Sequence, residues 1–307
     1  MLPLKDYLAN PAILFSSLLE HYGTWIPERI YLKWLFRLKT GNRLDLIHPQ
    51  SFGEKIQWLK LYNRKPEYTE MVDKIAVKGY VADILGSEYV IPTIGVWDNP
   101  DEIDWDSLPF QFVLKTSHGG GSSGVVICKD KSSFIKQEAI SRLKKSMRND
   151  IYRVLKEWPY KNVPKRIIAE EFICPEHDAK DLADYKWYCF NGEPVFCQVI
   201  QNRSIKETID FFDTKWVHQD FIGLNPLAIH ATEQPSRPHD LEGQIRIARK
   251  LSKGIPFVRV DLYQAEERIF FGEITFYPMS GFGRFVPEQY NTVLGNMLVL
   301  PAHSNQK

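Results

Sequence analysis

Apolar residues in the middle and C-terminal parts of this chain occur in short runs separated by polar and glycine-rich segments, a pattern typical of strands joined by turns. The runs that predict strands are 112–114, 125–127, 166–173, 184–190, 196–200, 257–263 and 268–275. Asn191-Gly192 lies between two of them and is a strong hairpin signal, because both residues accept a left-handed backbone. We therefore expect antiparallel sheets with tight turns.

Helical periodicity dominates residues 11–63. Residues 31–39 are amphipathic at helical spacing, and Gly41 ends that segment. A second helix is expected to begin at Ser51, because Ser51 and Glu54 have the spacing of a capping box. The chain thus begins with a helical, unusually aromatic region.

Further helices are expected over 73–85, within the basic stretch 132–157, and over about 239–253. In the first of these, Lys74 and Lys78 are four residues apart and so share one helical face. The order of helices and strands predicts a mixed α+β protein.

Two interpretations of the amphipathic segment 31–39 stay open. Its aromatic residues interleave with lysine and arginine, which suits docking on a membrane surface or on a partner protein. The alternative is a helix packed on the body of the protein, which is the commoner use of such a stripe.

The composition is that of a soluble folded protein. The 307 residues are 44% hydrophobic and 25% charged, enough for one large or two interlocked lobes. A net charge of +1 offers no basic footprint, so we expect no nucleic-acid partner. No segment predicts a membrane span or a signal peptide. The four cysteines lie in apolar runs without metal-ligand spacing, so we expect reduced core thiols in a cytoplasmic protein.

The segment 115–124 predicts a phosphate-binding lid between two strands. Its candidate positions are Lys115, Gly119, Gly120, Gly121, Ser122 and Ser123. Consecutive glycines let the backbone approach a bulky anion, and their N–H groups can line a concavity for phosphate oxygens. The lysine precedes the glycines and a strand follows them, unlike the P-loop and the dinucleotide fingerprint. A flexible hairpin without a ligand is the alternative.

Two carboxylates interrupt the last apolar runs. Asp261 lies among apolar residues, and Glu273 interrupts a run of isoleucine and phenylalanine. Burial of an unpaired carboxylate is costly, so such groups bind a cation or form ion pairs. Two carboxylates on adjacent strands suit Mg²⁺, which prefers oxygen ligands. Structural salt bridges with Arg259 or Arg268 are the alternative.

The order of these features resembles the ATP-grasp superfamily. The resemblance implies ATP and Mg²⁺ as cofactors, with Lys74 and Lys115 as the two phosphate-binding lysines. It identifies Glu170-Glu171-Phe172-Ile173 as the hinge, with Glu170 and the backbone of Glu171 and Ile173 facing the adenine. Asp261 and Glu273 fall at the metal-binding positions. Thr275 departs from the family, where asparagine is usual, although its hydroxyl can still reach a metal.

Several other residues are candidates for contacts with the nucleotide or a substrate. Alternation along 184–190 puts Asp184 and Lys186 on one face, where Lys186 is a candidate for the phosphates and Asp184 for the ribose. A plain Asp–Lys pair on the surface is the alternative. Asp178 is a competing candidate for the ribose. Arg203 is a candidate for the transferring phosphate or a substrate carboxylate, and Arg259 for the negative charge that develops in the reaction, with structural roles as the alternative for each.

A closer resemblance covers nearly the full length. The segments 51–60, 184–192 and 272–278 are similar to the TupA-like branch of ATP-grasp proteins, which is associated with bacterial surface polysaccharides and teichuronopeptide synthesis. This implies two α+β lobes that clasp a nucleotide. The expected division is a helical N-terminal extension over 1–65, an N-terminal lobe with the lid over 66–172, and a C-terminal lobe with the metal site over 173–307.

The resemblance implies an ATP-dependent carboxylate–amine ligase that works through an acyl phosphate. The expected substrates are a uronic acid-containing saccharide and an amino acid or amine. A sugar or glycolipid kinase is one alternative. A non-catalytic nucleotide-binding or glycosyltransferase-associated component of polysaccharide assembly is another. We expect a cytoplasmic location, with peripheral contact at the inner face of the membrane or with assembly proteins as a further possibility.

Overall fold

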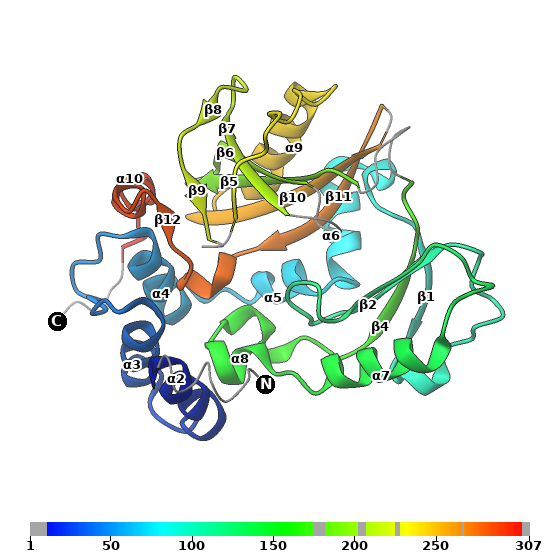
Figure 1. The fold of residues 1–307 in the computed structure, drawn as a ribbon, viewed down its shortest axis with the longest axis horizontal. Coiled ribbons are helices and arrows are strands. Elements are labelled where there is room, and N and C mark those ends of the chain that lie inside the picture. The colour runs from blue at the N-terminus through cyan, green and yellow to red at the C-terminus, as the bar shows by residue number, and fades with distance from the viewer. Residues whose placement is uncertain (1–10, 175–181, 202–206, 225–227, 266, 303–307) are drawn as a thin grey trace.

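The computed structural model describes residues 11–174, 182–201, 207–224, 228–265 and 267–302 (Figure 1). Two antiparallel sheets organise these residues, and Figure 1 shows the larger sheet above and the smaller one below it to the right. The predicted strands are all present, and the mixed α+β class is confirmed. Two of the expected helices have different bounds.

The smaller sheet has four strands in the order β1-β4-β2-β3. They are β1 (Thr93–Trp97), β2 (Phe112–Thr116), β3 (Val125–Cys128) and β4 (Ile167–Glu171). Helix α7 (Lys136–Met147) covers one face, where Leu143 packs with Phe112 and Leu114 in a separate small core. The short 3-10 helices η1 (Ser87–Tyr89) and η2 (Pro100–Glu102) flank β1. This sheet therefore carries the lid hairpin on a core of its own.

The larger sheet has six strands in the order β11-β10-β5-β6-β7-β8. They are β5 (Asp184–Phe190), β6 (Glu193–Gln201), β7 (Thr208–Asp213), β8 (His218–Gln219), β10 (Phe257–Ala265) and β11 (Arg268–Thr275). Asn191 and Gly192 both have positive φ in the β5–β6 turn, as the hairpin signal predicts. Helix α9 (Leu241–Ser252) covers one face, where Gln244 accepts a hydrogen bond from the Trp187 indole at 3.0 Å.

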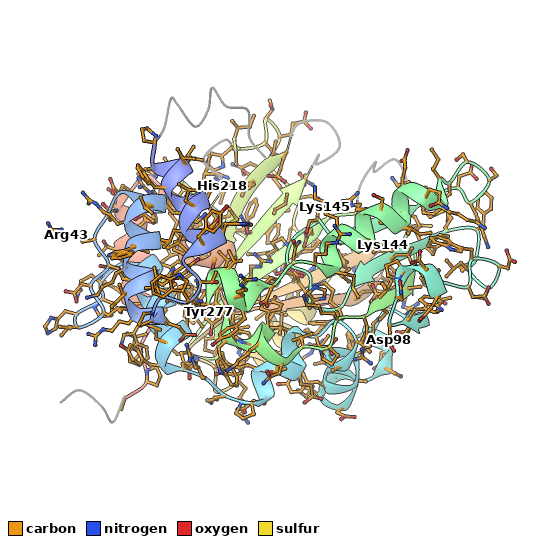
Figure 2. The ribbon with its side chains drawn as sticks, turned by 90° about the horizontal axis from the view of Figure 1, so that it is seen from below. Arg43, Asp98, Lys144, Lys145, His218 and Tyr277 are labelled. Atoms are coloured by element: carbon orange, nitrogen blue, oxygen red, sulfur yellow. The ribbon has the colours of Figure 1, made fainter. Side chains whose placement is uncertain are left out.

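The N-terminal helices form the left side of Figure 1. They are α2 (Pro11–Tyr22), α3 (Glu28–Thr40) and α4 (Phe52–Tyr62), and α4 packs on the C-terminal helix α10 (Gln289–Met297). Ser51 and Glu54 form the predicted capping box. Seen from below, Arg43 and Lys144 lie toward opposite ends of the molecule (Figure 2). None of the helices in the described ranges combines the length and apolar character that a membrane span requires.

A buried lysine ties these helices to the turn that follows β11. Lys60 of α4 is fully buried, and its ammonium donates to the Ser280 carbonyl at 2.8 Å and to the Leu155 carbonyl at 3.0 Å. Ser280 lies in η4 (Pro278–Gly281), where it and Met279 have positive φ. The lysine thus holds an unfavourable backbone turn in place. A small sheet of β9 (Ile222–Gly223) and β12 (Phe285–Val286) lies beyond this turn.

Two helix predictions are corrected. The helix expected over 73–85 begins at Ala76 as α6 (Ala76–Leu85), after the short α5 (Glu67–Val72). Lys74 therefore lies on the turn before the helix. The stretch 132–157 contains two helices, α7 and α8 (Ile151–Leu155). The second helix begins separately because the Asp150 side chain caps its N-terminus. The 3-10 helix η3 (Trp158–Asn162) follows. The thiol prediction is wrong for Cys174, which is exposed after β4, whereas the other three free cysteines are buried in strands.

A bulge sets the register between β10 and β11. Asp261 pairs with Glu273, but the next residue, Leu262, pairs with Phe271, so Gly272 is the extra residue. A Cβ on Gly272 would lie 2.9 Å from the Tyr263 ring. The bulge therefore needs glycine and leaves the two carboxylates directly opposite one another.

Candidate active site

The glycine-rich segment is a lid whose tip is exposed. Strands β2 and β3 pair antiparallel, with Lys115 opposite Val125, so the segment joins two hydrogen-bonded strands as predicted. Residues 120–123 at the tip are exposed. Arg142 of α7 donates to the carbonyls of Ser122 at 2.7 Å and Ser123 at 3.2 Å. Hydrogen bonds from the Arg142 side chain thus support the loop from the α7 side and leave its tip open.

Glycine is required for different reasons at two positions of the lid. A Cβ on Gly119 would lie 2.3 Å from the Thr116 hydroxyl, so this position has no room for a side chain. Gly121 has φ +63 and nothing within 4 Å of a Cβ, so its backbone conformation is what favours glycine. Gly120 is restricted only by the tip of the Ile151 side chain, at 3.3 Å.

Lys74 reaches the lid from the turn before α6. Its ammonium donates to the Gly119 carbonyl at 2.5 Å, and its backbone N–H donates to the Ser117 carbonyl at 3.1 Å. Burial lowers the pKa of Lys74, and the carboxylate of Glu273 works against that shift. The Lys74 ammonium is thus held beneath the lid backbone.

Glu170 of β4, in the small sheet, forms ion pairs with two lysines. Its carboxylate lies 2.6 Å from the Lys78 ammonium and 2.5 Å from the Lys115 ammonium, and it is almost fully buried. Burial alone would raise the pKa of Glu170, but the two lysines lower it. Lys78 was not among the predicted site residues, although the helix expected over 73–85 would have placed Lys74 and Lys78 on one face.

The face formed by β10 and β11 gathers the predicted metal ligands around a guanidinium. Arg259 pairs with Thr275 and Asp261 with Glu273, and directly opposite residues point to the same side of the sheet. Arg259 Nη2 lies 2.7 Å from Asp261 Oδ2, 3.1 Å from Glu273 Oε1 and 3.1 Å from Thr275 Oγ1. The ion pair with Arg259, the alternative to a metal site, is therefore present. Arg268 takes no part, because its guanidinium lies over the Phe270 ring.

Strand β5 adds a lysine to the same face. Lys186 pairs with Asp261 across the strands, and its ammonium contacts the carboxylates of Asp261 and, at 2.9 Å, Asp184. All three side chains are buried. The Asp184–Lys186 pair therefore lies inside the site and is not a surface pair.

The electrostatics of the two carboxylates differ. Burial would raise the pKa of Glu273, but Lys74, Lys186 and Arg259 lower it to about 2. Burial raises the pKa of Asp261 against the opposing effect of Arg259 and Lys186. Glu273 is thus a stable anion that faces several cations.

The two sheets meet at this cluster. Lys74 Nζ lies 3.8 Å from Glu273 Oε2, which joins the lid side to the carboxylate side. The remaining predicted positions are peripheral: Glu171 is exposed, and Ile173 packs in a small cluster with Ile91 and Phe270. Asp178 and Arg203 lie outside the described residues.

The donor set fits a hard divalent cation. Asp261, Glu273 and Thr275 offer only oxygen atoms, and one nitrogen of Arg259 contacts all three side chains at once. Their oxygens therefore surround a position that suits a cation. Oxygen ligands of this kind are the ones that Mg²⁺ prefers.

Two antiparallel sheets, with a glycine-rich hairpin on one and facing carboxylates on the other, define an ATP-grasp fold. The family model described as TupA-like ATP-grasp matches residues 54–299, so the chain belongs to the TupA-like ATP-grasp family. No curated protein matches the sequence.

Among solved structures, the chain is similar to D-alanine–D-alanine ligases. The ligase from Helicobacter pylori has 17% identity and a TM-score of 0.42, with 81% of this chain and 69% of that chain covered. The ligase from Bacillus anthracis complexed with ATP has 15% identity and a TM-score of 0.37, with 68% of this chain and 54% of that one covered. The ATP-grasp ligase PsnB, complexed with a minimal precursor, Mg and ADP, has 12% identity and a TM-score of 0.37, with 73% and 57% covered. The chain thus spans little more than half of two of these relatives.

Proposed function

We propose that the protein is an ATP-dependent carboxylate–amine ligase that forms an amide through an acyl phosphate. Family membership and the convergence of lysines and carboxylates at one cluster support this function. The single observation that carries it is the contact of Lys74 with both the Gly119 carbonyl of the lid and the Glu273 carboxylate of β11. A nucleotide held there would touch both sheets.

The proposed reaction has two balanced steps. An oxygen of the substrate carboxylate attacks the γ-phosphorus of ATP, the bond to the β–γ bridging oxygen breaks, and ADP leaves. The amine nitrogen then attacks the acyl carbon, phosphate leaves, and the nitrogen loses a proton. Positioning and electrostatics carry most of such a phosphoryl transfer, so no side-chain nucleophile is required.

The chain's own cations supply that electrostatic environment. Lys74 and Lys115 would contact the phosphates under the lid, and Lys186 would reach them from β5. Arg259, which is partly buried among the carboxylates, would stabilise the charge that develops on the transferring group. Mg²⁺, held by Asp261 and Glu273 with Thr275 as a third donor, would offset the charge of the phosphate oxygens.

The nucleoside would lie toward the hinge. The backbone of Glu171 and Ile173 would face the adenine, while Asp184 or Asp178 would contact the ribose. Glu170 would orient Lys78 and Lys115, because its carboxylate already contacts both ammonium groups. Arg203 stays a candidate for the substrate carboxylate.

The proposed substrates follow from the family resemblance. A uronic acid in a saccharide would supply the carboxylate, and an amino acid or amine would supply the nucleophile. Surface-polysaccharide synthesis would then use the amide product. The test is an ADP-release screen of amino acids against free, nucleotide-linked and polymer-bound uronic acids, with Mg²⁺ present.

Two measurements separate the ligase from its rivals. Hydroxylamine should trap the acyl phosphate as a hydroxamate when ATP and the acid are present without an amine. A phosphorylated hydroxyl product, with no hydroxamate, would establish a kinase instead. ATP binding without any ADP release across the screen would favour a non-catalytic component.

A further inference from the structure

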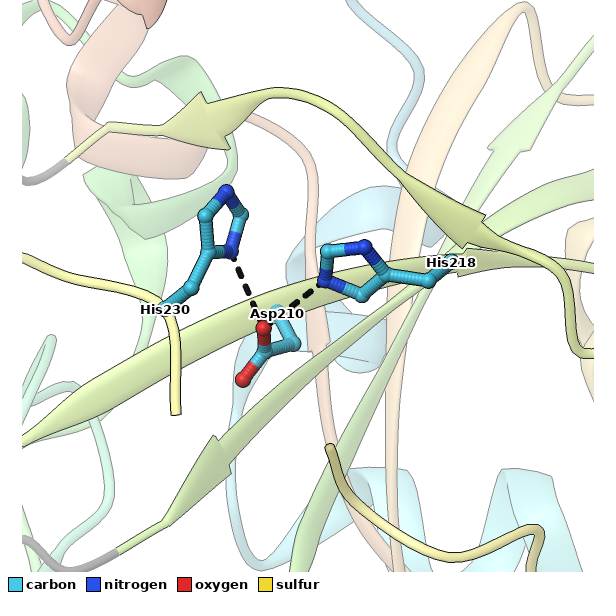
Figure 3. Close-up of side chains that lie close together, drawn as sticks. All are labelled: Asp210, His218 and His230. Atoms are coloured by element: carbon cyan, nitrogen blue, oxygen red, sulfur yellow. Dashed lines mark hydrogen bonds and ion pairs between the residues drawn. The ribbon is translucent and has the colours of Figure 1, made fainter. Parts of the chain in front are cut away.

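A cluster of one aspartate and two histidines lies at β7 and β8 of the large sheet (Figure 3). Asp210 of β7 is fully buried, and its Oδ1 lies 2.9 Å from His218 Nε2 and 2.9 Å from His230 Nδ1. The two imidazole rings meet edge to face, with centroids 4.9 Å apart. Three potential ligand atoms from three segments therefore converge.

The strand register puts this cluster on the opposite face of the sheet from the carboxylates of β10. Lys186 pairs with Gln198, whereas Asp210 pairs with Val199, the next residue along β6. Adjacent residues of a strand point to opposite faces, so Asp210 and Lys186 face away from each other. Strands β5 and β6 also separate β7 from β10, a span of about 14 Å at the usual strand spacing. The cluster thus cannot share a ligand with the nucleotide site.

Backbone pairing holds all three side chains. His218 lies on β8, which pairs with β7 through a tight turn in which Asp213 donates its N–H to the Val217 carbonyl at 3.0 Å. The segment around His230 runs beside β7, where Ile209 donates to the Ile229 carbonyl at 3.0 Å. The arrangement is therefore built into the sheet edge.

A backbone hydrogen bond orients the Asp210 carboxylate. The backbone N–H of Ala231 donates to Asp210 Oδ2 at 3.1 Å, which leaves Oδ1 facing the two histidines. Partners of this kind fix the ligands of metal sites. His218 and His230 are partly exposed, so the side facing away from Asp210 is open to solvent.

We propose that Asp210, His218 and His230 bind a divalent transition-metal ion, zinc in the first instance, with water in a fourth position. The three ligand atoms lie within 4.8 Å of one another. Ligand atoms of tetrahedral zinc lie about 3.4 Å apart, so the two 2.9 Å contacts would lengthen by about 0.5 Å, and the two histidine nitrogens, which lie within 4.8 Å of each other, would adjust to the same spacing. Two imidazole nitrogens favour zinc, cobalt or nickel over Mg²⁺. The ion would fasten β8 and the segment around His230 to β7.

The test measures metal binding directly. The protein is stripped with a chelator and titrated with Zn²⁺ in excess Mg²⁺, which is added to compete for the carboxylates of β10 and β11. We expect one Zn²⁺ per chain and a rise in melting temperature. Co²⁺ in place of Zn²⁺ should give the visible bands of a tetrahedral nitrogen–oxygen site.

The variants His218→Ala and His230→Ala should each weaken Zn²⁺ binding by about 100-fold or more and abolish the rise in melting temperature. His48→Ala, at an exposed histidine elsewhere, is the matched control and should bind normally. Circular dichroism and the melting temperature without metal show whether each variant folds. No Zn²⁺ binding by the folded wild type, or equal binding by the folded histidine variants, would overturn the proposal. The two histidines would then be hydrogen-bond partners of a buried carboxylate only.

A second, independent feature is an exposed aromatic surface on α2 and α3. The side chain of Trp25 is 82% exposed and that of Trp34 is 54% exposed. With their neighbours they line an apolar groove of about 650 Å³. Phe15, Leu18, Tyr22, Trp25 and Trp34 form this aromatic surface. Contiguous exposed apolar patches mark interaction sites.

Cations accompany the aromatic surface at regular spacing. Arg29, Lys33 and Arg37 are exposed at intervals of four residues along α3, so they share a face next to Trp34. Of the nearby carboxylates, Asp45 interacts with Lys33, and the other two form ion pairs with cations outside the row. Glu20 pairs with Lys39 at 2.7 Å, and Glu28 pairs with Arg64 at 2.5 Å. The surface is thus apolar with a net positive rim.

We propose that the aromatic surface docks on an anionic lipid surface. Tryptophan and tyrosine favour the bilayer interface, and the row of cations complements acidic headgroups. The remaining hydrophobic side of α3, with Leu32, Leu35 and Phe36, is buried in the protein core. Packing on the body of the protein is therefore confirmed for one side of α3, and the other side is the one we propose for docking.

Vesicle co-sedimentation tests this proposal. We expect binding to vesicles with phosphatidylglycerol and weak binding to pure phosphatidylcholine. Lys33→Gln should weaken binding about fivefold, and Trp25→Ser with Trp34→Ser should abolish it. Phe110→Ser, at another exposed aromatic, is the control. Equal binding by the aromatic double variant would overturn the proposal. The proposal would also be overturned if the wild type bound no lipid and formed a dimer that dissociates in the double variant. A second copy of the chain would then cover the aromatic surface.

Discussion

Lys74 and Glu273 lie 3.8 Å apart, from ammonium to carboxylate, although they come from opposite halves of the chain. This contact is where the lid side of the molecule meets the strand pair β10–β11. Because Lys74 also donates to the Gly119 carbonyl, one ammonium group contacts both halves of the proposed site. The first predictions therefore concern these groups.

Glu273→Gln should lower the rate of ADP release by about 100-fold or more, because it removes an anion from the proposed metal site. The assay is steady-state ADP release with the substrates identified in the screen. Glu193→Gln, at an exposed carboxylate paired with Arg249, should leave the rate unchanged. Wild-type activity in a folded Glu273→Gln protein would contradict the role proposed for this residue.

Lys115→Met should lower the free energy of unfolding by about 2 kcal/mol, because it removes a charged partner of the buried Glu170. Its removal should also raise the pKa of Glu170, which Lys78 alone would then hold down. Adding Glu170→Gln should recover part of the loss. Urea denaturation of the two single variants and the double variant measures the coupling, and strictly additive values would count against the pair.

Gly119→Ala should raise the KM for ATP about tenfold, because overpacking costs about 1–3 kcal/mol where a Cβ meets the Thr116 hydroxyl. Gly120→Ala should have a smaller effect, since only the end of the Ile151 side chain must move. Gly79→Ala, in open space on α6, should leave the KM unchanged. Equal KM values for the Gly119 and Gly79 variants would exclude a tight lid.

Stability should fall as the pH drops below about 6.5, partly through His118. Burial lowers the pKa of this histidine, and the positive charge of Lys165 adds to the effect. The unfolded chain then binds the proton at a higher pH than the folded protein, so His118 contributes stability above pH 6.5 that is lost on acidification. His118→Phe should flatten this part of the profile. Urea denaturation between pH 7.5 and about 5 tests the difference, and parallel profiles would contradict it.

Lys60→Met should lower the free energy of unfolding by about 3 kcal/mol, because it leaves the carbonyls of Ser280 and Leu155 without their hydrogen-bond donor. Lys215→Met, at an exposed position, should change it by less than about 0.5 kcal/mol. Thermal or urea unfolding measures both. Equal stability of the two variants would mean that the turn after β11 holds its own conformation.

The sequence determined those parts of this protein that depend on local pattern. The lid could be predicted because Lys115, its glycines and the flanking apolar runs are contiguous. The hairpin at Asn191-Gly192 and the capping box at Ser51 are local for the same reason, since backbone conformation and nearest-neighbour hydrogen bonds decide them. The carboxylates of β10 and β11 stood out because charged residues in apolar strands are rare.

Only the tertiary structure decided which side chains meet. The bulge at Gly272 aligns Asp261 with Glu273, and strand order brings Lys186 beside them. The cluster of Asp210 and two histidines is assembled from three segments whose pairing no local pattern encodes. Such contacts depend on register and on which faces are buried, and these result from the packing of the whole chain.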